Sequence, residues 1–340
     1  MDGKPPGPGP HNLITDVAGL KVGQTHDPAV RTGVTVILPD DRAVCACDVR
    51  GGAPGTRETD ALAPDTLVEA VDAVVLAGGS VYGLSAADGV TAWLGAQGRG
   101  YGLVEGVPKS PVVPAAILFD MANGGDKAWG EDPPHRELGR RAVAAAGLEV
   151  ALGTAGAGYG AMAGGLKGGT GSASVVTFDG FTVGAIVAVN SWGSVVAPGG
   201  RTFWASPYEI GHEFGGLGAA GLRAAPDQWG SAKRGDETRN TTIACVATDA
   251  ILTPAQAKRL AVMAQDGLAR AIRPIHAPFD GDVVFALATG RRPLGPEPNY
   301  TLGRLGALAA DTLARAVARA VFEATPWPDT YVPCWRDLPA

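Results

Sequence analysis

Segments of strand length and segments of helix length occur in groups along this 340-residue chain instead of alternating strictly. Short apolar runs at residues 34–38, 44–49 and 72–76 all precede the first helical pattern, which begins near Leu84. A parallel sheet built from βαβ units would need a helix after each strand. The grouping therefore predicts an α/β protein in which sheets are layered as a sandwich with helices on the outside.

A long antiparallel hairpin is predicted around the dipeptide Asp179-Gly180. The segments 172–177 and 181–190 on either side have strand-like sequences. Asp-Gly is favoured in a type I′ turn because both central residues of that turn need positive φ. We therefore expect two paired strands, the second of which ends at Asn190.

Two helices are predicted in the last third of the chain. Thr253-Pro-Ala-Gln256 is a capping box with proline at the first helical position, so a helix should run over residues 254–272. Its apolar residues repeat at helical spacing, and Lys258, Gln265 and Arg270 are expected to face away from the core. The last helix is indicated by the spacing of Leu305, Leu308, Leu313 and Val317.

The charge of the chain argues against two classes of partner. Its formal net charge is −6 and no run of basic residues occurs, so the patterns typical of nucleic-acid binding and of polybasic membrane attachment are missing. The first eleven residues lack the apolar segment of a secretory signal, and no apolar stretch has membrane-spanning length. We expect a cytoplasmic protein with no nucleic-acid and no membrane partner.

The spacing of cysteine and histidine indicates no metal site. The cysteines, at positions 45, 47, 245 and 334, match neither a structural zinc site nor a redox C-x-x-C. The five histidines show no ligand spacing such as H-x-x-x-H, and no G-x-S-x-G motif of a serine hydrolase occurs. We expect free, buried thiols in a protein without a metal.

Glycine is strongly enriched, with 50 residues, about twice the usual share of roughly 7%. Residues 156–161 formally match the dinucleotide-binding pattern G-x-G-x-x-A. However, the glycine run continues to Thr170 without a helix, and the expected acidic residue is missing about 20 positions later, except for Asp179 in the predicted turn. Lys167 lies within this run, where the backbone leaves room for a ligand, and is a candidate site residue.

The clearest break in the pattern ends directly before Thr241. From residue 198 to residue 239 the sequence is rich in glycine, proline and charge, and the polar stretch 233–239 is expected to be exposed and mobile. A threonine between such a segment and a buried strand can attack the preceding carbonyl and become a free N-terminus. Its α-amino group, with a reference pKa near 7.7 to 8.0, would then serve as its own base. The simpler interpretation is a β-branched residue that begins a strand.

Asp280-Gly-Asp282 lies just before the predicted strand at residues 283–288. This motif is typical of a solvated turn. Two carboxylates at the entrance of a strand can also orient an ammonium group and tune its pKa.

Two segments, residues 240–249 and His276-Ala-Pro-Phe-Asp-Gly-Asp282, closely resemble the DmpA aminopeptidase and NylC oligoamide hydrolase family of N-terminal nucleophile hydrolases. The likeness extends over nearly the whole chain, through residues 48–52, 76–84, 165–169 and 187–190. It implies a four-layer αββα sandwich and self-cleavage into a larger chain, 1–240, and a smaller chain, 241–340. It also implies a homo-oligomer of cleaved pairs, and no metal or organic cofactor.

The resemblance also implies roles for individual residues. Thr241 would be the nucleophile, with its own amine as base, and Asp280 and Asp282 would order the site around that amine. Lys167 would hold the hydroxyl in its reactive form by its positive charge. The Asn190 amide would donate a hydrogen bond to the oxyanion of the tetrahedral intermediate.

The substrate stays open between several alternatives, with Tyr82 expected to line its pocket. The Asn240–Thr241 junction is similar to the NylC type and favours short oligoamides such as 6-aminohexanoate oligomers. Residues 12–23 and 156–169 are more similar to the aminopeptidase branch, which favours release of N-terminal amino acids, including D- or β-residues, from peptides, amides or esters. Acyl transfer to an amine is a further alternative. A non-enzymatic small-molecule-binding protein would keep the chain intact.

Overall fold

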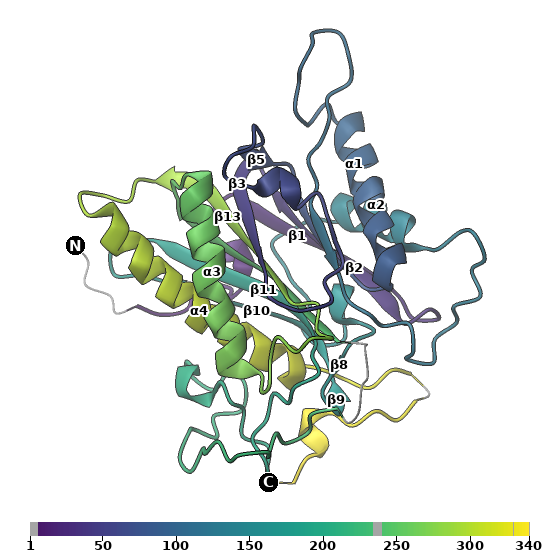
Figure 1. Ribbon diagram of the computed structural model, residues 1–340, viewed down its shortest axis with the longest axis vertical. Helices are drawn as coiled ribbons and strands as arrows, with labels where there is room; N and C mark the ends of the chain where they lie inside the picture. Colours follow the sequence, from purple (N-terminus) through teal and green to yellow (C-terminus); the bar gives the residue numbers. More distant parts are fainter. Residues whose placement is uncertain (1–5, 234–239, 329, 340) are drawn as a thin grey trace.

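Two β-sheets lie face to face between two pairs of helices in the computed structural model, which describes residues 6–233, 240–328 and 330–339 (Figure 1). The order of the layers is helices, six-stranded sheet, five-stranded sheet and helices. The αββα sandwich implied by the sequence resemblance is confirmed. Of the polar stretch predicted to be exposed, residues 234–239 lie outside the described residues.

The six-stranded sheet contains the strand that begins at Thr241. Its strands follow in the order β10 (Gly169–Val176), β11 (Thr182–Asn190), β12 (Thr241–Ala250), β13 (Val283–Arg292), β3 (Ala43–Val49) and β5 (Ala70–Val71). Strands β12 and β13 are parallel, and the other neighbours are antiparallel. Because β12 lies between β11 and β13, both of its neighbours position the start of the strand.

The five-stranded sheet covers the other face of this layer. Its strands follow in the order β1 (Leu20–Asp27), β2 (Thr32–Pro39), β6 (Val74–Ala77), β7 (Ala115–Ile117) and β4 (Thr56–Arg57). Only the β6 and β7 pair is parallel among these described strands. A small ribbon of β8 (Met162–Ala163) and β9 (Leu166–Lys167) extends beyond the sheets.

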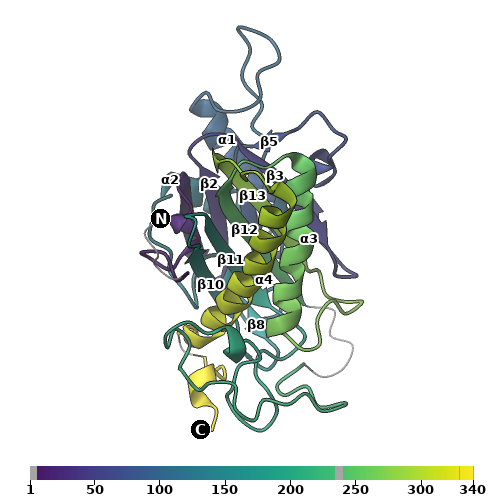
Figure 2. The same cartoon turned by 90° about the vertical axis from the view of Figure 1, so that its left-hand side faces the viewer.

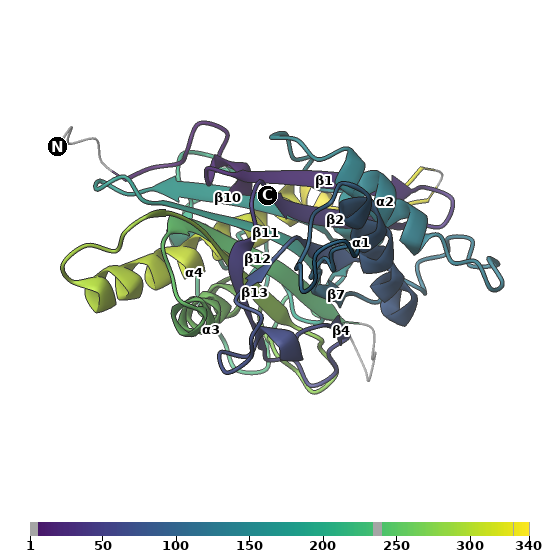
Figure 3. The same cartoon turned by 90° about the horizontal axis from the view of Figure 1, so that it is seen from above.

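Each sheet is covered on its outer face by two helices. Helices α1 (Ala86–Ala96) and α2 (His135–Ala144) pack on the five-stranded sheet, and α3 (Pro254–Ala271) and α4 (Pro298–Phe322) pack side by side on the six-stranded sheet (Figures 2 and 3). No helix in the described ranges is both long and apolar enough to cross a membrane.

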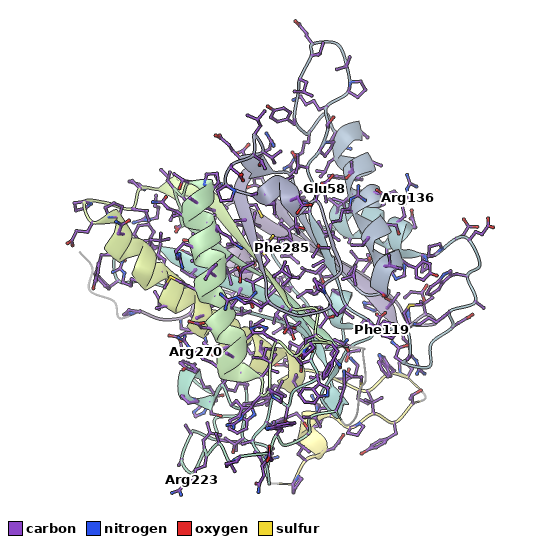
Figure 4. The ribbon with its side chains drawn as sticks, in the orientation of Figure 1. Glu58, Phe119, Arg136, Arg223, Arg270 and Phe285 are labelled. Carbon is purple, nitrogen blue, oxygen red and sulfur yellow. The ribbon has the colours of Figure 1, made fainter. Side chains whose placement is uncertain are left out.

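The apolar sequence of β12 follows from burial on both faces. Ile243 and Cys245 contribute to the core between the sheets, together with Phe285 of β13, which is labelled in Figure 4. The alternate residues Ala244 and Val246 pack against the layer of α3 and α4. A strand covered on both sides reads as a continuous apolar run, because successive side chains point to opposite faces.

The predicted hairpin is confirmed, but its predicted turn type is wrong. Strands β10 and β11 pair in antiparallel register, and the Thr177 amide donates to the Phe181 carbonyl at 2.8 Å. The loop therefore has three residues, 178–180, and in it only Gly180 has positive φ, at 84°. This is the arrangement of a type I turn followed by a left-handed glycine, which needs positive φ at one position instead of two.

The capping box at the start of α3 is confirmed, with Thr253 and Gln256 bonded reciprocally. The prediction that Gln265 faces away from the core is wrong. Its side chain is buried, and its Nε2 donates to the Asp48 carbonyl of β3 at 2.8 Å. The helix lies directly over β3, so this polar side chain satisfies a strand carbonyl that faces the helix.

The four cysteines are free thiols, as predicted. Three of them are buried, and Cys47 is only partly buried.

Candidate active site

Thr241 begins β12 at a point where three separate segments meet. It lies opposite Asn190, the last residue of β11, in the antiparallel ladder. The preceding residue, Asn240, forms a parallel bridge with Asp280. Both Thr241 and Asn240 are buried. The structure thus brings the predicted nucleophile, its predicted cleavage partner, Asn190 and Asp280 into one place.

The carbonyl group of Asn240 receives two hydrogen bonds. The Thr241 hydroxyl donates to the Asn240 oxygen, and the Gly281 amide donates to the same oxygen at 3.0 Å. A side chain at position 281 would place its Cβ 2.7 Å from Thr241 Oγ1, which explains why glycine stands there. The hydroxyl therefore lies against a carbonyl that is already polarised by a backbone donor.

Asp282 connects β12 with the loop that precedes β13. Its Oδ1 accepts a hydrogen bond from the Thr242 amide at 2.7 Å. Its Oδ2 accepts from the His276 amide at 3.1 Å and lies 2.8 Å from His276 Nδ1. The carboxylate is fully buried, so these bonds replace the hydration that it loses. Sequence reasoning did not single out His276, although it begins the motif that ends in Asp282.

Asp280 holds the middle of the same loop. Its Oδ2 accepts from the Ala277 amide at 3.0 Å, and its Oδ1 accepts from the Trp192 amide at 3.4 Å. Burial raises the pKa of this carboxyl to about 6, and the nearby charge of Asp282 contributes in the same direction. The carboxyl group thus titrates well above the range of an exposed aspartate.

The segment that follows β3 packs tightly behind this loop. The Arg50 amide donates to the Asp282 carbonyl at 3.0 Å, and the Ala53 amide donates to the Asp280 carbonyl at 2.8 Å. A Cβ on Gly51 would lie 2.3 Å from both the Asp280 oxygen and the Asp282 nitrogen. The Gly-Gly pair after β3 is therefore required for the two backbones to approach.

Hydrogen bonds to two other described residues fix the Asn190 side chain. Its Oδ1 accepts from the Met162 amide at 2.9 Å, and its Nδ2 donates to the Phe119 carbonyl at 3.0 Å. Phe119, labelled in Figure 4, lies toward the end of the sheets near β8 and β9. The amide is thus held beside Thr241 in a defined orientation.

Lys167 is fully buried on β9, but its ammonium group bonds to backbone carbonyls and not to the Thr241 hydroxyl. Nζ lies 2.7 Å from the Gly168 oxygen, 3.1 Å from that of Ala161 and 3.4 Å from that of Gly158. Burial lowers its pKa to about 7. Because β9 pairs with β8, whose Met162 binds Asn190, the described contacts connect Lys167 to Thr241 indirectly.

A cavity of about 330 Å³ opens next to Asn190. Lys233 lines it and also donates from Nζ to the Asn240 side-chain oxygen at 2.8 Å. The rest of its wall consists of Phe119, Asp120, Ala122, Asn123, Gly160, Met162, Trp327, Tyr331, Val332 and Pro333. The wall is mainly apolar, and the charged side chains among these lining residues are Asp120 and Lys233.

Tyr82 does not belong to the wall of this cavity as the structure describes it. It lies at the surface, 46% exposed, and packs edge-on against Trp129. Within the described ranges, no group of three or more histidine, cysteine, aspartate or glutamate residues could hold a metal ion.

Residues 12–330 match the model of peptidase family S58. The chain belongs to this family. The sequence resemblance to DmpA-type enzymes is thereby confirmed, and so is the prediction of an amide-bond hydrolase.

This S58 family member is similar to two curated relatives and one solved structure over most of their length. An uncharacterized aminopeptidase of Mycobacterium tuberculosis is 45% identical over 352 residues, covering 96% of this chain and 98% of the relative. A 6-aminohexanoate-oligomer endohydrolase of Agromyces sp. is 29% identical over 328 residues, covering 91% and 85%. The L-aminopeptidase D-Ala-esterase/amidase of Ochrobactrum anthropi, a variant of the Ntn hydrolase fold, superposes with a TM-score of 0.70 at 23% identity, covering 95% and 89%.

Proposed function

We propose that this S58 family member is a self-processing amide hydrolase in which Thr241 becomes the N-terminal nucleophile. The observation that carries the proposal is the contact of the Thr241 hydroxyl with the Asn240 carbonyl, whose oxygen also accepts from the Gly281 amide. This contact keeps the hydroxyl beside the carbonyl group whose carbon it would attack, and the fixed backbone donor would stabilise the charge that develops on the oxygen. The proposed products are a 1–240 chain and a 241–340 chain.

Self-cleavage transfers the Asn240 acyl group from the Thr241 nitrogen to the Thr241 oxygen. Oγ1 attacks the carbonyl carbon and loses its proton, the carbon–nitrogen bond breaks, and the nitrogen takes up a proton. Water then hydrolyses the resulting ester, which leaves a carboxyl group on Asn240 and a free amine on Thr241. Lys233, which holds the Asn240 side chain, would keep this residue in place during the transfer.

Turnover uses the amine that self-cleavage creates. In its neutral form this amine accepts the proton of Oγ1, which attacks the amide carbonyl of the substrate. The protonated amine then gives its proton to the leaving amine, and water releases the acid from the acyl-enzyme. In this scheme Asn190 would donate to the substrate oxyanion. Lys167 would orient the segment that holds Asn190 instead of bonding to the hydroxyl.

The substrate that fits best is a short peptide or amide with a free amino group. The cavity beside Asn190 has room for a small acyl group, and its wall includes the buried carboxyl of Asp120. The relative that is 45% identical is named an aminopeptidase. A second candidate is internal cleavage of oligoamides, which the Asn240–Thr241 junction and the endohydrolase of Agromyces sp. favour. In either case the cleaved pairs are expected to form a homo-oligomer.

A pair of matched substrates separates the two candidates. One is a short oligoamide with a free N-terminal amine, and the other is the same oligoamide acetylated there. We expect hydrolysis of the free compound and at most traces of turnover of the acetylated one. Equal rates on both compounds would exclude the aminopeptidase and support the endohydrolase.

Replacing Asn240 with alanine is expected to slow self-cleavage about tenfold. The side chain accepts a hydrogen bond from the Lys233 ammonium, and such charge-assisted bonds contribute roughly 1.5 to 3 kcal/mol. Once cut, the variant should turn over substrate within about twofold of the native rate. Time courses of refolded precursor on gels measure the first effect. The Lys233→Met variant should show the same delay, and the double variant should add little to it.

The rate of self-cleavage is expected to fall as the pH drops below about 6. The pKa of Asp280 is raised from 3.8 to about 6, so the carboxylate that holds the loop at Gly281 is ionised above that pH and neutralised below it. The uncut chain has no free amine on Thr241, so its amine cannot cause this decline. Cleavage of refolded precursor should be followed between pH 4.5 and 8. A decline centred near pH 4, or one that persists in Asp280→Asn, would refute the assignment.

A further inference from the structure

His276 begins the loop that carries Asp280 and Asp282, and its backbone is left-handed, with φ of 59°. In this conformation its main-chain amide and its ring Nδ1 both reach Asp282 Oδ2, at 3.1 and 2.8 Å. Glycine adopts positive φ most readily, and among the other residues only asparagine, aspartate and histidine are enriched there. Both the ring and the unusual backbone are thus directed to one oxygen of a buried carboxylate.

The other oxygen of Asp282 acts on the nucleophile strand. Oδ1 accepts from the Thr242 amide at 2.7 Å, and this amide belongs to the peptide that joins Thr242 to Thr241. The Asp282 side chain is fully buried, whereas that of His276 is 21% exposed. A chain of contacts therefore leads from the partly exposed ring through the carboxylate to the nucleophile.

We propose that His276 is a positioning residue for Thr241, acting through Asp282. Its ring holds the carboxylate so that the Thr242 amide, and with it Thr241, stays in register with Asn190 and Gly281. Its described hydrogen bonds reach Asp282 only, so it takes no direct part in the reaction. The inference rests on the proposed role of Thr241 as nucleophile.

Two substitutions separate the ring contact from the backbone conformation. Asparagine and glycine both tolerate positive φ, but only asparagine keeps a side-chain donor that can reach Asp282. We expect His276→Gly to slow self-cleavage and to lower kcat of the cleaved enzyme by about tenfold or more, as for loss of a hydrogen bond to a charged group. KM should stay within about twofold. His276→Asn should recover both rates to within about threefold of the native protein.

The rates are measured per folded molecule, with near-ultraviolet circular dichroism as the check on folding. The inference would be overturned if His276→Gly cleaved itself and turned over substrate at native rates, or if asparagine gave no recovery. It would also be overturned if only KM changed. Thr241→Ala distinguishes this failure from failure of the proposed function, because native activity in that variant would remove Thr241 as the nucleophile whatever His276 does.

Discussion

Replacing Thr241 with alanine is expected to leave the chain uncut and to reduce amide hydrolysis by at least about 10³-fold, since removal of a catalytic nucleophile can lower kcat by about 10⁶-fold. The variant lacks the hydroxyl that contacts the Asn240 carbonyl, and without cleavage it also lacks the α-amine that we propose as the base. Gel electrophoresis and an assay with a peptide amide measure the two effects. Full hydrolysis by the uncut variant would contradict the proposed mechanism.

Two further variants control this experiment. Thr241→Ser keeps a hydroxyl at the same atom position and should still be cut and active. Thr242→Val changes the next residue, which is also fully buried and whose hydroxyl has no hydrogen-bond partner in the described part of the chain. Because valine has a similar shape and removes an unsatisfied polar group, this variant should retain both cleavage and activity.

The second large effect is expected from Gly51→Ala, a substitution in a segment far from Thr241 in sequence. Its Cβ would lie 2.3 Å from the backbone of Asp280 and of Asp282, a distance that real Cβ atoms do not tolerate. The loop must then move, and Gly281 and the bond from Asp282 to Thr242 move with it. We expect self-cleavage to be slowed at least about 100-fold, since misplacement by about 1 Å can have that effect.

Gly303→Ala is the matched control for this glycine. Position 303 lies in α4, and a Cβ there would have nothing within 4 Å. Alanine in place of glycine within a helix is stabilising by roughly 1 kcal/mol, so this variant should be cut at the native rate and unfold at slightly higher denaturant. If Gly51→Ala behaved in the same way, the close packing behind the loop would not matter for the site.

The sequence predicts local features of this fold well. The capping box at Thr253 and the paired strands around Asp179-Gly180 depend on neighbouring residues, so their signals lie within a few positions. The type of turn and the burial of Gln265 were predicted wrongly. The type of turn depends on how the loop closes between β10 and β11, and the burial of Gln265 depends on β3, which lies beneath α3. No local sequence pattern shows either of these features.

The candidate site was predicted in part, and mostly through resemblance. The resemblance singled out Thr241, Asn190, Asp280 and Asp282, which the structure brings together. His276 was missed because its importance arises from a hydrogen bond to Asp282, and nothing in its neighbours indicates positive φ.

Lys233 and Gly51 were missed as site residues for a similar reason. Each acts on a residue brought close by the fold, Lys233 on the Asn240 side chain and Gly51 on the backbone of the loop before β13. Such contacts between distant segments cannot be derived from periodicity or composition.

Self-cleavage between Asn240 and Thr241 is measured by the intact mass of the purified protein together with N-terminal sequencing. We expect self-cleavage to give two fragments of about 24 and 10 kDa, scaled from 34.4 kDa by residue number, with the smaller one beginning Thr-Thr-Ile-Ala-Cys. A single chain of 34.4 kDa that hydrolyses amides under folding conditions would contradict it.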